Sequence, residues 1–154
     1  MSEESDSTVD SPEGGRQYQG PAGGDGGRPF FDDSIASGDR IAEIRIWSGS
    51  VVDSIQLVLI RGDGSIRTLD RHGGSGGDPS SFSLARGESI VRIWGRCGDL
   101  IDKLNIQTSA GKTYTFGGGG GRSTYSFSVP QGQKFDGFWG RSGSLIDALG
   151  IIHR

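Results

Sequence analysis

The chain has 154 residues, enough for one domain with a sizeable core, and 29 of them are glycine without the G-X-Y period of collagen. The formal net charge is -3 and Lys and Arg form no run, which argues against nucleic acid as a partner and against a basic helix on a membrane surface. Cys97 is the only cysteine, which excludes an internal disulfide and a cysteine-based metal cage.

The N-terminal segment is acidic. Residues 1–16 hold five acids and one base, so the rest of the chain is nearly neutral. A segment of this composition buries too little apolar surface to order itself, and we expect residues 1–19 to form a disordered tail before a folded domain at residues 20–154. The segment lacks the apolar run of a secretory signal, and no stretch of about 18 apolar residues follows it. We therefore expect a cytoplasmic protein without membrane insertion.

Three glycine clusters repeat along the domain at intervals of 44 to 50 residues. They are GGDGG at residues 23–27, GGSGG at residues 73–77 and GGGGG at residues 117–121. Self-similarity at such a period is the signature of a repeated structural unit. The sequence therefore predicts a domain with threefold internal repetition.

Pairs of β-type segments lie between the clusters. Apolar and polar residues alternate in "RIAEIRIW" (residues 40–47) and "ESIVRIW" (residues 88–94), and the alternation resumes in "DSIQLVLI" (residues 53–60) and "DKLNIQT" (residues 102–108). "RGDGSI" at residues 61–66 carries the Asp-Gly signal of a tight hairpin turn. Because no segment has a convincing helical period, we predict an all-β domain of three sheets around a pseudo-threefold axis.

Each of the three tryptophans precedes a loop that ends in Asp-x-aliphatic-x-aliphatic. Trp47 precedes "DSIQL", Trp94 precedes "DKLNI" and Trp139 precedes "DALGI", so we align the repeats on the tryptophans. In this alignment the loop at residues 48–53 is two residues shorter than its counterparts. Each tryptophan strand and the following Asp strand should form a hairpin with the loop at its tip. On such an alternating strand we interpret the tryptophans as packing residues rather than as platforms for a ligand.

These features resemble the jacalin-related lectins of the mannose-specific type, which have the β-prism I fold. The resemblance covers residues 20–154 and rests on "GPAGGDGG" (residues 20–27), "GGSGGDP" (residues 73–79) and the Gly-x-x-x-Asp loop in "WGRSGSLIDALGI" (residues 139–151). It implies three four-stranded antiparallel sheets built from Greek-key-like repeats. It also implies a non-enzymatic lectin, without metal or cofactor, that binds sugar between a Gly-x-x-x-Asp loop and the last glycine of a cluster.

The resemblance implies three sugar sites, because the loop motif occurs three times. We name each site after its aspartate. The Asp147 site consists of Gly27, Gly143, Ser144, Leu145 and Asp147. The Asp53 site consists of Gly77, Gly49, Ser50, Val51 and Asp53. The Asp102 site consists of Gly121, Gly98, Asp99, Leu100 and Asp102.

The chemistry of sugars explains these residue types. A hexose presents hydroxyls that donate and accept, so its site needs fixed donors and a strong acceptor. An ionised Asp accepts from two neighbouring hydroxyls, the unpaired N–H groups of a hairpin tip donate, and glycine lets another backbone N–H approach the ring. In the resembled family galactose binding goes with aromatic loop residues and a freed N-terminal glycine, whereas Ser144 and Leu145 are not aromatic and Gly27 is internal. We therefore expect mannose- and glucose-containing glycans as partners, bound by a homo-oligomer (a dimer or larger) that gains avidity from many sites.

Other classes of site explain the same segments less well. The glycine clusters resemble phosphate-cradling loops and the calcium-binding GGxGxD repeat, but no Lys-Ser/Thr pair follows them and they are not in tandem. "RGD" at residues 61–63 matches an integrin-type tripeptide, and the Asp-Gly turn accounts for it. His72 and His153 would join Cys97 in a metal or catalytic site only if the fold brought them together.

Two functional alternatives to a lectin remain. Asp99 and Asp102 share a loop, as the paired carboxylates of a glycosidase would, but the other two copies have Ser at the first position. The second alternative is a non-catalytic β-prism module that binds a protein partner. The aspartate present in all three loops favours the sugar-binding interpretation.

Overall fold

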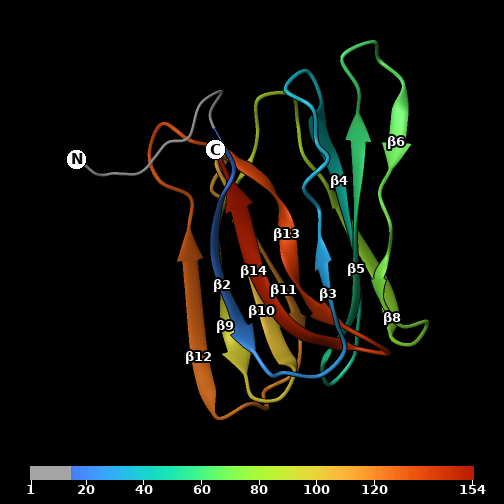
Figure 1. Ribbon diagram of the computed structural model, residues 1–154, viewed down its shortest axis with the longest axis vertical. Coiled ribbons are helices and arrows are strands. Elements are labelled where there is room, and N and C mark those ends of the chain that lie inside the picture. The colour runs from blue at the N-terminus through green and yellow to red at the C-terminus, as the bar shows by residue number, and fades with distance from the viewer. Residues whose placement is uncertain (1–14) are drawn as a thin grey trace.

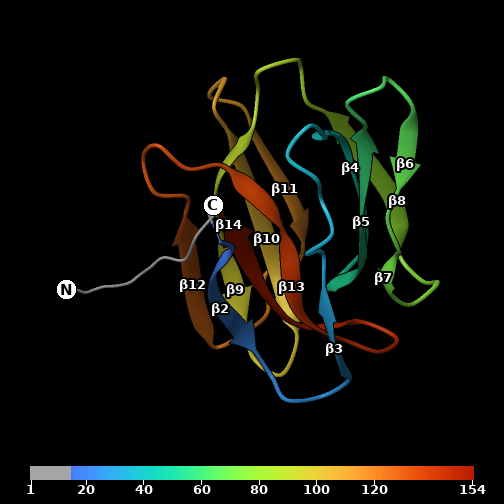
Figure 2. The same cartoon turned by 45° about the horizontal axis from the view of Figure 1, so that its top comes forward.

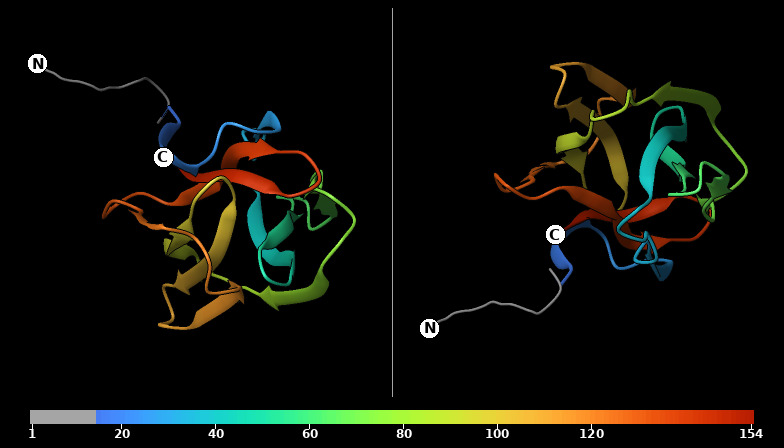
Figure 3. Two further views of the ribbon diagram at one scale, coloured as in Figure 1. Left: turned by 90° about the horizontal axis from the view of Figure 1, so that it is seen from below. Right: turned by 90° about the horizontal axis from the view of Figure 1, so that it is seen from above.

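The structure is a computed structural model that describes residues 15–154. Every helix or strand in this range is a β-strand, and the strands form three antiparallel sheets. The sheets stand as the three sides of a prism around a common axis (Figures 1 and 3). The predicted all-β fold with pseudo-threefold symmetry is therefore confirmed. Within residues 15–154 there is no helix long and apolar enough to cross a membrane.

The bounds of the strands, in the order in which they pair, define the three sheets. Sheet 1 contains β2 (Gln17–Gly23), β14 (Ile146–His153), β13 (Phe135–Ser142) and β3 (Arg28–Phe31). Sheet 2 contains β6 (Ile66–Thr68), β5 (Val52–Ile60), β4 (Arg40–Ser48) and β8 (Asp78–Ser83), with β7 (His72–Gly73) also paired to β5. Sheet 3 contains β11 (Thr113–Gly117), β10 (Ile101–Thr108), β9 (Ile90–Cys97) and β12 (Ser123–Ser128).

Sheet 2 has five strands rather than the expected four, because the partner of β5 is divided into β6 and β7. Leu69 lies between them, donates its N–H to the carbonyl of Leu57 and is buried in the core. Drawing this apolar side chain inward interrupts the regular pairing. Figure 2 shows the two short strands along the outer edge of the sheet.

Sheet 1 is assembled from both ends of the chain, since β2 and β3 flank the C-terminal strands β14 and β13. Asp136 fastens the two ends together: its Oδ2 lies 2.8 Å from Nε of Arg16 and 3.2 Å from Nε of Arg154. Both guanidinium groups also donate to the carbonyl of Ile35. The expected boundary between residues 19 and 20 is therefore too late, because β2 begins at Gln17. The expected disorder of residues 1–14 lies outside the described residues.

The core fills the axis of the prism and explains the alternating pattern. Ile44 and Ile46 of β4, Ile93 of β9 and Leu104 and Ile106 of β10 are all fully buried. Burying one such side chain contributes about 1.5–3 kcal/mol of transfer free energy. The apolar residues of all three sheets form one cluster, so no sheet would keep its inner face dry alone.

The expected alignment of the repeats on their tryptophans is wrong. Trp94 and Trp139 lie opposite the third residue after the aspartate of their hairpins. Trp47 instead lies opposite Ser54, the first residue after Asp53. Trp47 is therefore two residues nearer to its loop than the other two tryptophans.

The three loops consequently have equal lengths, and the loop at residues 48–53 is not shortened. In each hairpin three residues separate the last paired positions, which are Ser48 and Val52, Cys97 and Ile101, and Ser142 and Ile146. The residues at the position of Trp47 in the other hairpins are Arg96 and Arg141. Side chains two residues apart in a strand point to the same face, so alternation alone does not reveal this shift.

The buried ring of His153 predicts how stability depends on pH. Gln19 donates from Nε2 to His153 Nε2 at 3.0 Å, and His153 Nδ1 donates to Gln133 Oε1 at 2.6 Å, an arrangement that needs the neutral ring. Burial lowers the pKa of His153 below its usual 6.5. Since the unfolded chain takes up the proton first, the free energy of unfolding should fall as the pH drops below about 6.5.

Urea unfolding at pH 7.5 and pH 5.5 measures this effect. The loss of stability at pH 5.5 should be smaller in His153→Gln than in the wild-type protein, because the variant has no proton to take up at this position. An equal loss in both proteins would show that His153 does not cause the dependence.

Candidate functional site

The three Gly-x-x-x-Asp segments form hairpin loops of one geometry. In the loop between β13 and β14, the N–H of Gly143 donates to the carbonyl of Leu145 at 3.0 Å. The other two loops have the same bond, from Gly49 to Val51 at 2.9 Å and from Gly98 to Leu100 at 3.0 Å. All three loops lie at the same end of the prism (Figures 1 and 3).

A glycine cluster lies against the aspartate of each loop. A Cβ added at Gly27 would lie 2.7 Å from Oδ1 of Asp147, and the corresponding distance is 2.8 Å at Gly77 for Asp53 and at Gly121 for Asp102. These glycines have φ angles of +68°, +84° and +87°, a region that other residues rarely adopt. The last glycine of each cluster is therefore required both by its backbone conformation and by its contact with the carboxylate.

The structure thus brings the residues of each predicted site together. Asp147, Asp53 and Asp102 are half-buried, and within residues 15–154 no side-chain hydrogen bond or ion pair occupies their carboxylates. Each site therefore offers an anionic acceptor beside loop N–H groups. Asp99 differs from its counterparts Ser50 and Ser144, since its carboxylate is 94% exposed and lies 3.9 Å from Nη2 of Arg122.

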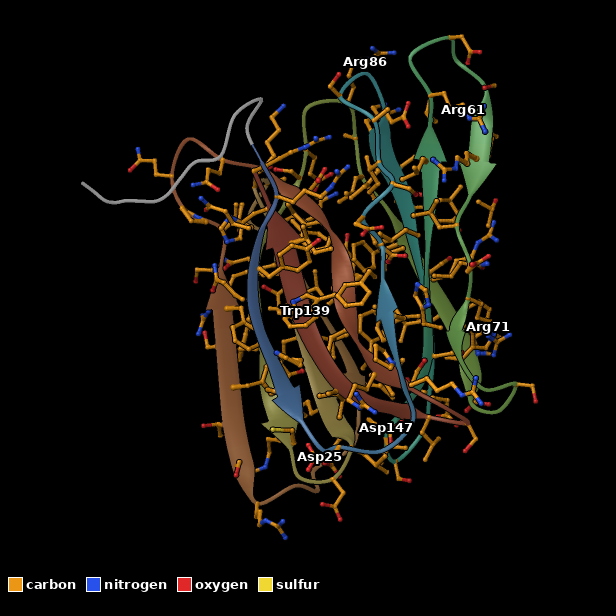
Figure 4. All side chains as sticks on the ribbon, viewed as in Figure 1. Asp25, Arg61, Arg71, Arg86, Trp139 and Asp147 are labelled. Atoms are coloured by element: carbon orange, nitrogen blue, oxygen red, sulfur yellow. The ribbon has the colours of Figure 1, made fainter. Side chains whose placement is uncertain are left out.

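The glycine clusters also join each loop to the next. Gly24 donates its N–H to the carbonyl of Asp147 at 2.8 Å, and a Cβ on Gly24 would overlap the carbonyl of Asp99 in the neighbouring repeat. Gly74 and Gly118 repeat this arrangement, Gly74 between Asp53 and Ser144, and Gly118 between Asp102 and Ser50. The three loops and three clusters therefore form a closed ring around the end of the prism. Figure 4 shows Asp25 and Asp147 at this end.

The sequence analysis missed two arginines that hold the clusters in place. Arg141 donates from Nε to the carbonyl of Gly26 and from Nη2 to that of Gly27, both at 3.0 Å. The bonds of Arg96 run from Nε to Gly120 and Gly121, each at 3.2 Å, and from Nη2 to Gly121 at 2.6 Å. The repeated "GR" in "GRCG" and "GRSG" was the available signal.

The tryptophans pack on the outer faces of the sheets, as predicted. Trp139 donates from Nε1 to the carbonyl of Gln19 at 2.9 Å and stacks on Phe31, with Tyr18 edge-on. Trp94 lies under the guanidinium of Arg92. The guanidinium of Arg71 covers Trp47 at 3.6 Å from its ring centre.

The two described cavities lie away from the loops. The larger, of about 280 Å³, is lined by residues that include Arg40, Ile90 and Phe135, the first residues of β4, β9 and β13, so it lies at the opposite end of the prism. The smaller, of about 140 Å³, contains Asp32 and His72. Neither contains a predicted site residue, so the candidate sites are shallow surface features.

The residues considered for other chemistries do not meet. His72 Nε2 lies 2.7 Å from Oδ1 of Asp32, and His153 binds two glutamines elsewhere. Burial raises the pKa of the Cys97 thiol, and the charge of Asp102 adds to this effect, which disfavours a reactive thiolate. The RGD tripeptide lies in a turn closed by a bond from the N–H of Gly64 to the carbonyl of Arg61.

Comparison with known proteins identifies relatives of the whole folded region. Residues 19–152 match the sequence model of the Jacalin-like lectin domain. The structure of Malaysian banana lectin is 31% identical with a TM-score of 0.79, and the match covers 91% of this chain and 99% of that one. A mannose-binding jacalin-related lectin from Ananas comosus, AcmJRL, is 28% identical with a TM-score of 0.75, over 90% and 96% of the two chains.

The same fold occurs at lower identity in artocarpin, whose structure was determined as a complex with mannotriose. That structure is 22% identical, with a TM-score of 0.78 over 90% of this chain and 97% of artocarpin. Together these similarities confirm the expected family and the β-prism architecture.

The close contact at Gly27 generates a prediction about stability. In Gly27→Ala the new Cβ would meet Ser142 at 2.5 Å and Asp147 at 2.7 Å, in addition to the strain of a positive φ. Gly87→Ala is a matched control, because Gly87 has a φ of +83° and open space around it. Urea unfolding should show that Gly27→Ala loses at least about 1 kcal/mol more than the control. Equal losses would mean that the loop adjusts freely.

Proposed function

Since the chain belongs to the Jacalin-like lectin family, we propose that it is a non-enzymatic lectin that binds mannose- and glucose-containing glycans through three sites. The observation that carries this proposal is the threefold recurrence of one arrangement: an aspartate without a protein partner in residues 15–154, facing a positive-φ glycine at a hairpin tip. Two structural relatives support the choice of sugar, since AcmJRL is described as mannose-binding and artocarpin was determined with mannotriose.

In each proposed site the aspartate accepts hydrogen bonds from two neighbouring hydroxyls of the hexose. The N–H groups of the loop and of the last cluster glycine donate to the ring edge. Glucose and mannose carry an equatorial O4 and galactose an axial one, so a carboxylate that holds O4 and O6 together discriminates between them. The site needs no metal and no cofactor for this chemistry.

A shallow site with a few hydrogen bonds holds a single sugar weakly. A dissociation constant in the millimolar range, about -4 kcal/mol, is the expected magnitude. Three sites at one end of the chain raise the avidity for a branched glycan, and a homo-oligomer multiplies it further. The exposed Tyr18 and Phe31 on either side of Trp139 support association of two chains through sheet 1.

Retention on mannose-agarose and elution by free mannose test the proposed function. The wild-type protein should be retained, whereas Asp53→Ala/Asp102→Ala/Asp147→Ala should flow through, because each substitution removes an acceptor. Asp70→Ala is the matched control, since Asp70 is exposed and distant in sequence from the loops. A wild-type protein that flows through would instead favour the alternative of a β-prism that binds a protein partner.

The single substitution Asp147→Ala tests the role of the carboxylate in one site. Calorimetric or NMR titration with methyl α-mannoside should show at least an approximately tenfold weaker Asp147 site, because hydroxyls that lose a charged acceptor cost about 1–3 kcal/mol. Circular dichroism should remain that of a β-protein, since a half-buried carboxylate at a loop tip supports little packing. Unchanged affinity at this site would exclude Asp147 from sugar binding.

A further inference from the structure

The three sites differ in how their glycine clusters are held. In the Asp147 site, Arg141 hydrogen-bonds the carbonyl of Gly26 at 3.0 Å, and in the Asp102 site Arg96 does the same for Gly120 at 3.2 Å. Trp47 stands at the equivalent position of β4, next to the Asp53 site. An indole ring has one donor and cannot bridge two neighbouring carbonyls as a guanidinium does.

The carbonyl that the arginine holds belongs to the peptide group that presents the sugar donor. The C=O of Gly26 and the N–H of Gly27 are parts of one planar trans peptide, so they point in opposite directions. A hydrogen bond that fixes the carbonyl of Gly26 therefore also fixes the direction of the Gly27 N–H. The same relation holds for the carbonyl of Gly120 and the N–H of Gly121.

The Asp53 site has no equivalent restraint. Within residues 15–154 no side chain donates to the carbonyl of Gly76 or Gly77. Arg71 does not replace the missing arginine, because its guanidinium stacks on Trp47 and its Nε donates to Ser54 Oγ at 2.8 Å. Its Nη2 is buried and finds no partner in the described part of the chain.

We propose that Arg141 and Arg96 are positioning residues that aim the sugar-binding N–H of their clusters, and that Trp47 makes the Asp53 site the weakest of the three for a hexose. This inference rests on the proposed function. A peptide group that is fixed before binding loses less freedom when the sugar arrives, so a restrained donor binds more tightly than a free one. Neither arginine needs to touch the sugar for this effect.

The experiment is a titration of ¹⁵N-labelled protein with methyl α-mannoside, followed by NMR. The amide signals of Gly27, Gly77 and Gly121 report the three sites separately in one molecule. We expect the dissociation constant at Gly77 to be at least about threefold higher than at Gly27 and Gly121, a preorganisation effect of modest size. Equal dissociation constants at all three glycines would overturn the inference.

Substitutions at the positioning residues give the second measurement. Arg96→Met should weaken binding only at Gly121, and Arg141→Met only at Gly27. Arg92→Met is the matched control, since Arg92 lies on the same strand and face as Arg96 but covers Trp94 and bonds Ser126. An equal effect of Arg96→Met and Arg92→Met at Gly121 would also overturn the inference.

Trp47→Arg is the decisive gain-of-function variant, because general destabilisation does not strengthen a site. It should lower the dissociation constant at Gly77 toward that at Gly27 and leave the other two sites unchanged. Trp47→Arg/Arg71→Ala removes the neighbouring cation, which would otherwise repel the new guanidinium. If neither variant strengthens binding at Gly77, Trp47 does not set the affinity of this site.

The same titration separates the inference from the proposed function. If no glycine amide responds to methyl α-mannoside up to tens of millimolar, far above the expected millimolar affinity, the proposed function itself fails. If all three respond equally and the arginine variants bind like the wild-type protein, the function stands and the inference fails.

Discussion

Close contact between glycine backbone and hairpin loops is the constraint on which the functional end of this molecule depends. Each cluster bonds the carbonyl of its own aspartate, for example Gly24 to Asp147, and lies against the loop of the adjacent repeat. No side chain larger than hydrogen fits at these contacts. The abundance of glycine therefore follows from the need to close a ring of six short segments, and the ring holds the three carboxylates at one end of the prism.

The rest of the prism supports this ring. The buried aliphatic residues of three sheets share one core, which fixes the hairpins relative to one another. At the other end, Asp136 fastens Arg16 and Arg154 and so joins the first and last strands of sheet 1. Because the Asp147 site combines Gly27 near the start of the chain with a loop near its end, it depends on this closure.

Repetition does not make the three sites identical. The hairpin loops share length and hydrogen bonding, but the side chains one step below the loops are Arg141, Arg96 and Trp47. Two of these residues reach the glycine carbonyls and one does not. A chain with sites of unequal strength at one end is suited to branched glycans, in which one arm binds first and raises the effective concentration of the others.

The sequence by itself determined the fold class, the position of most strands and the residues that gather at each loop, because alternation, turn signals and glycine clusters are local patterns. It did not determine the register of Trp47, since a shift of two residues leaves a side chain on the same face of the strand. Nor did it reveal the division between β6 and β7, where the pull of the core on Leu69 interrupts the pairing. The contacts of Arg96 and Arg141 with glycine carbonyls, and the closure of the ring, were decided only by tertiary structure, because they join segments that are far apart in the sequence.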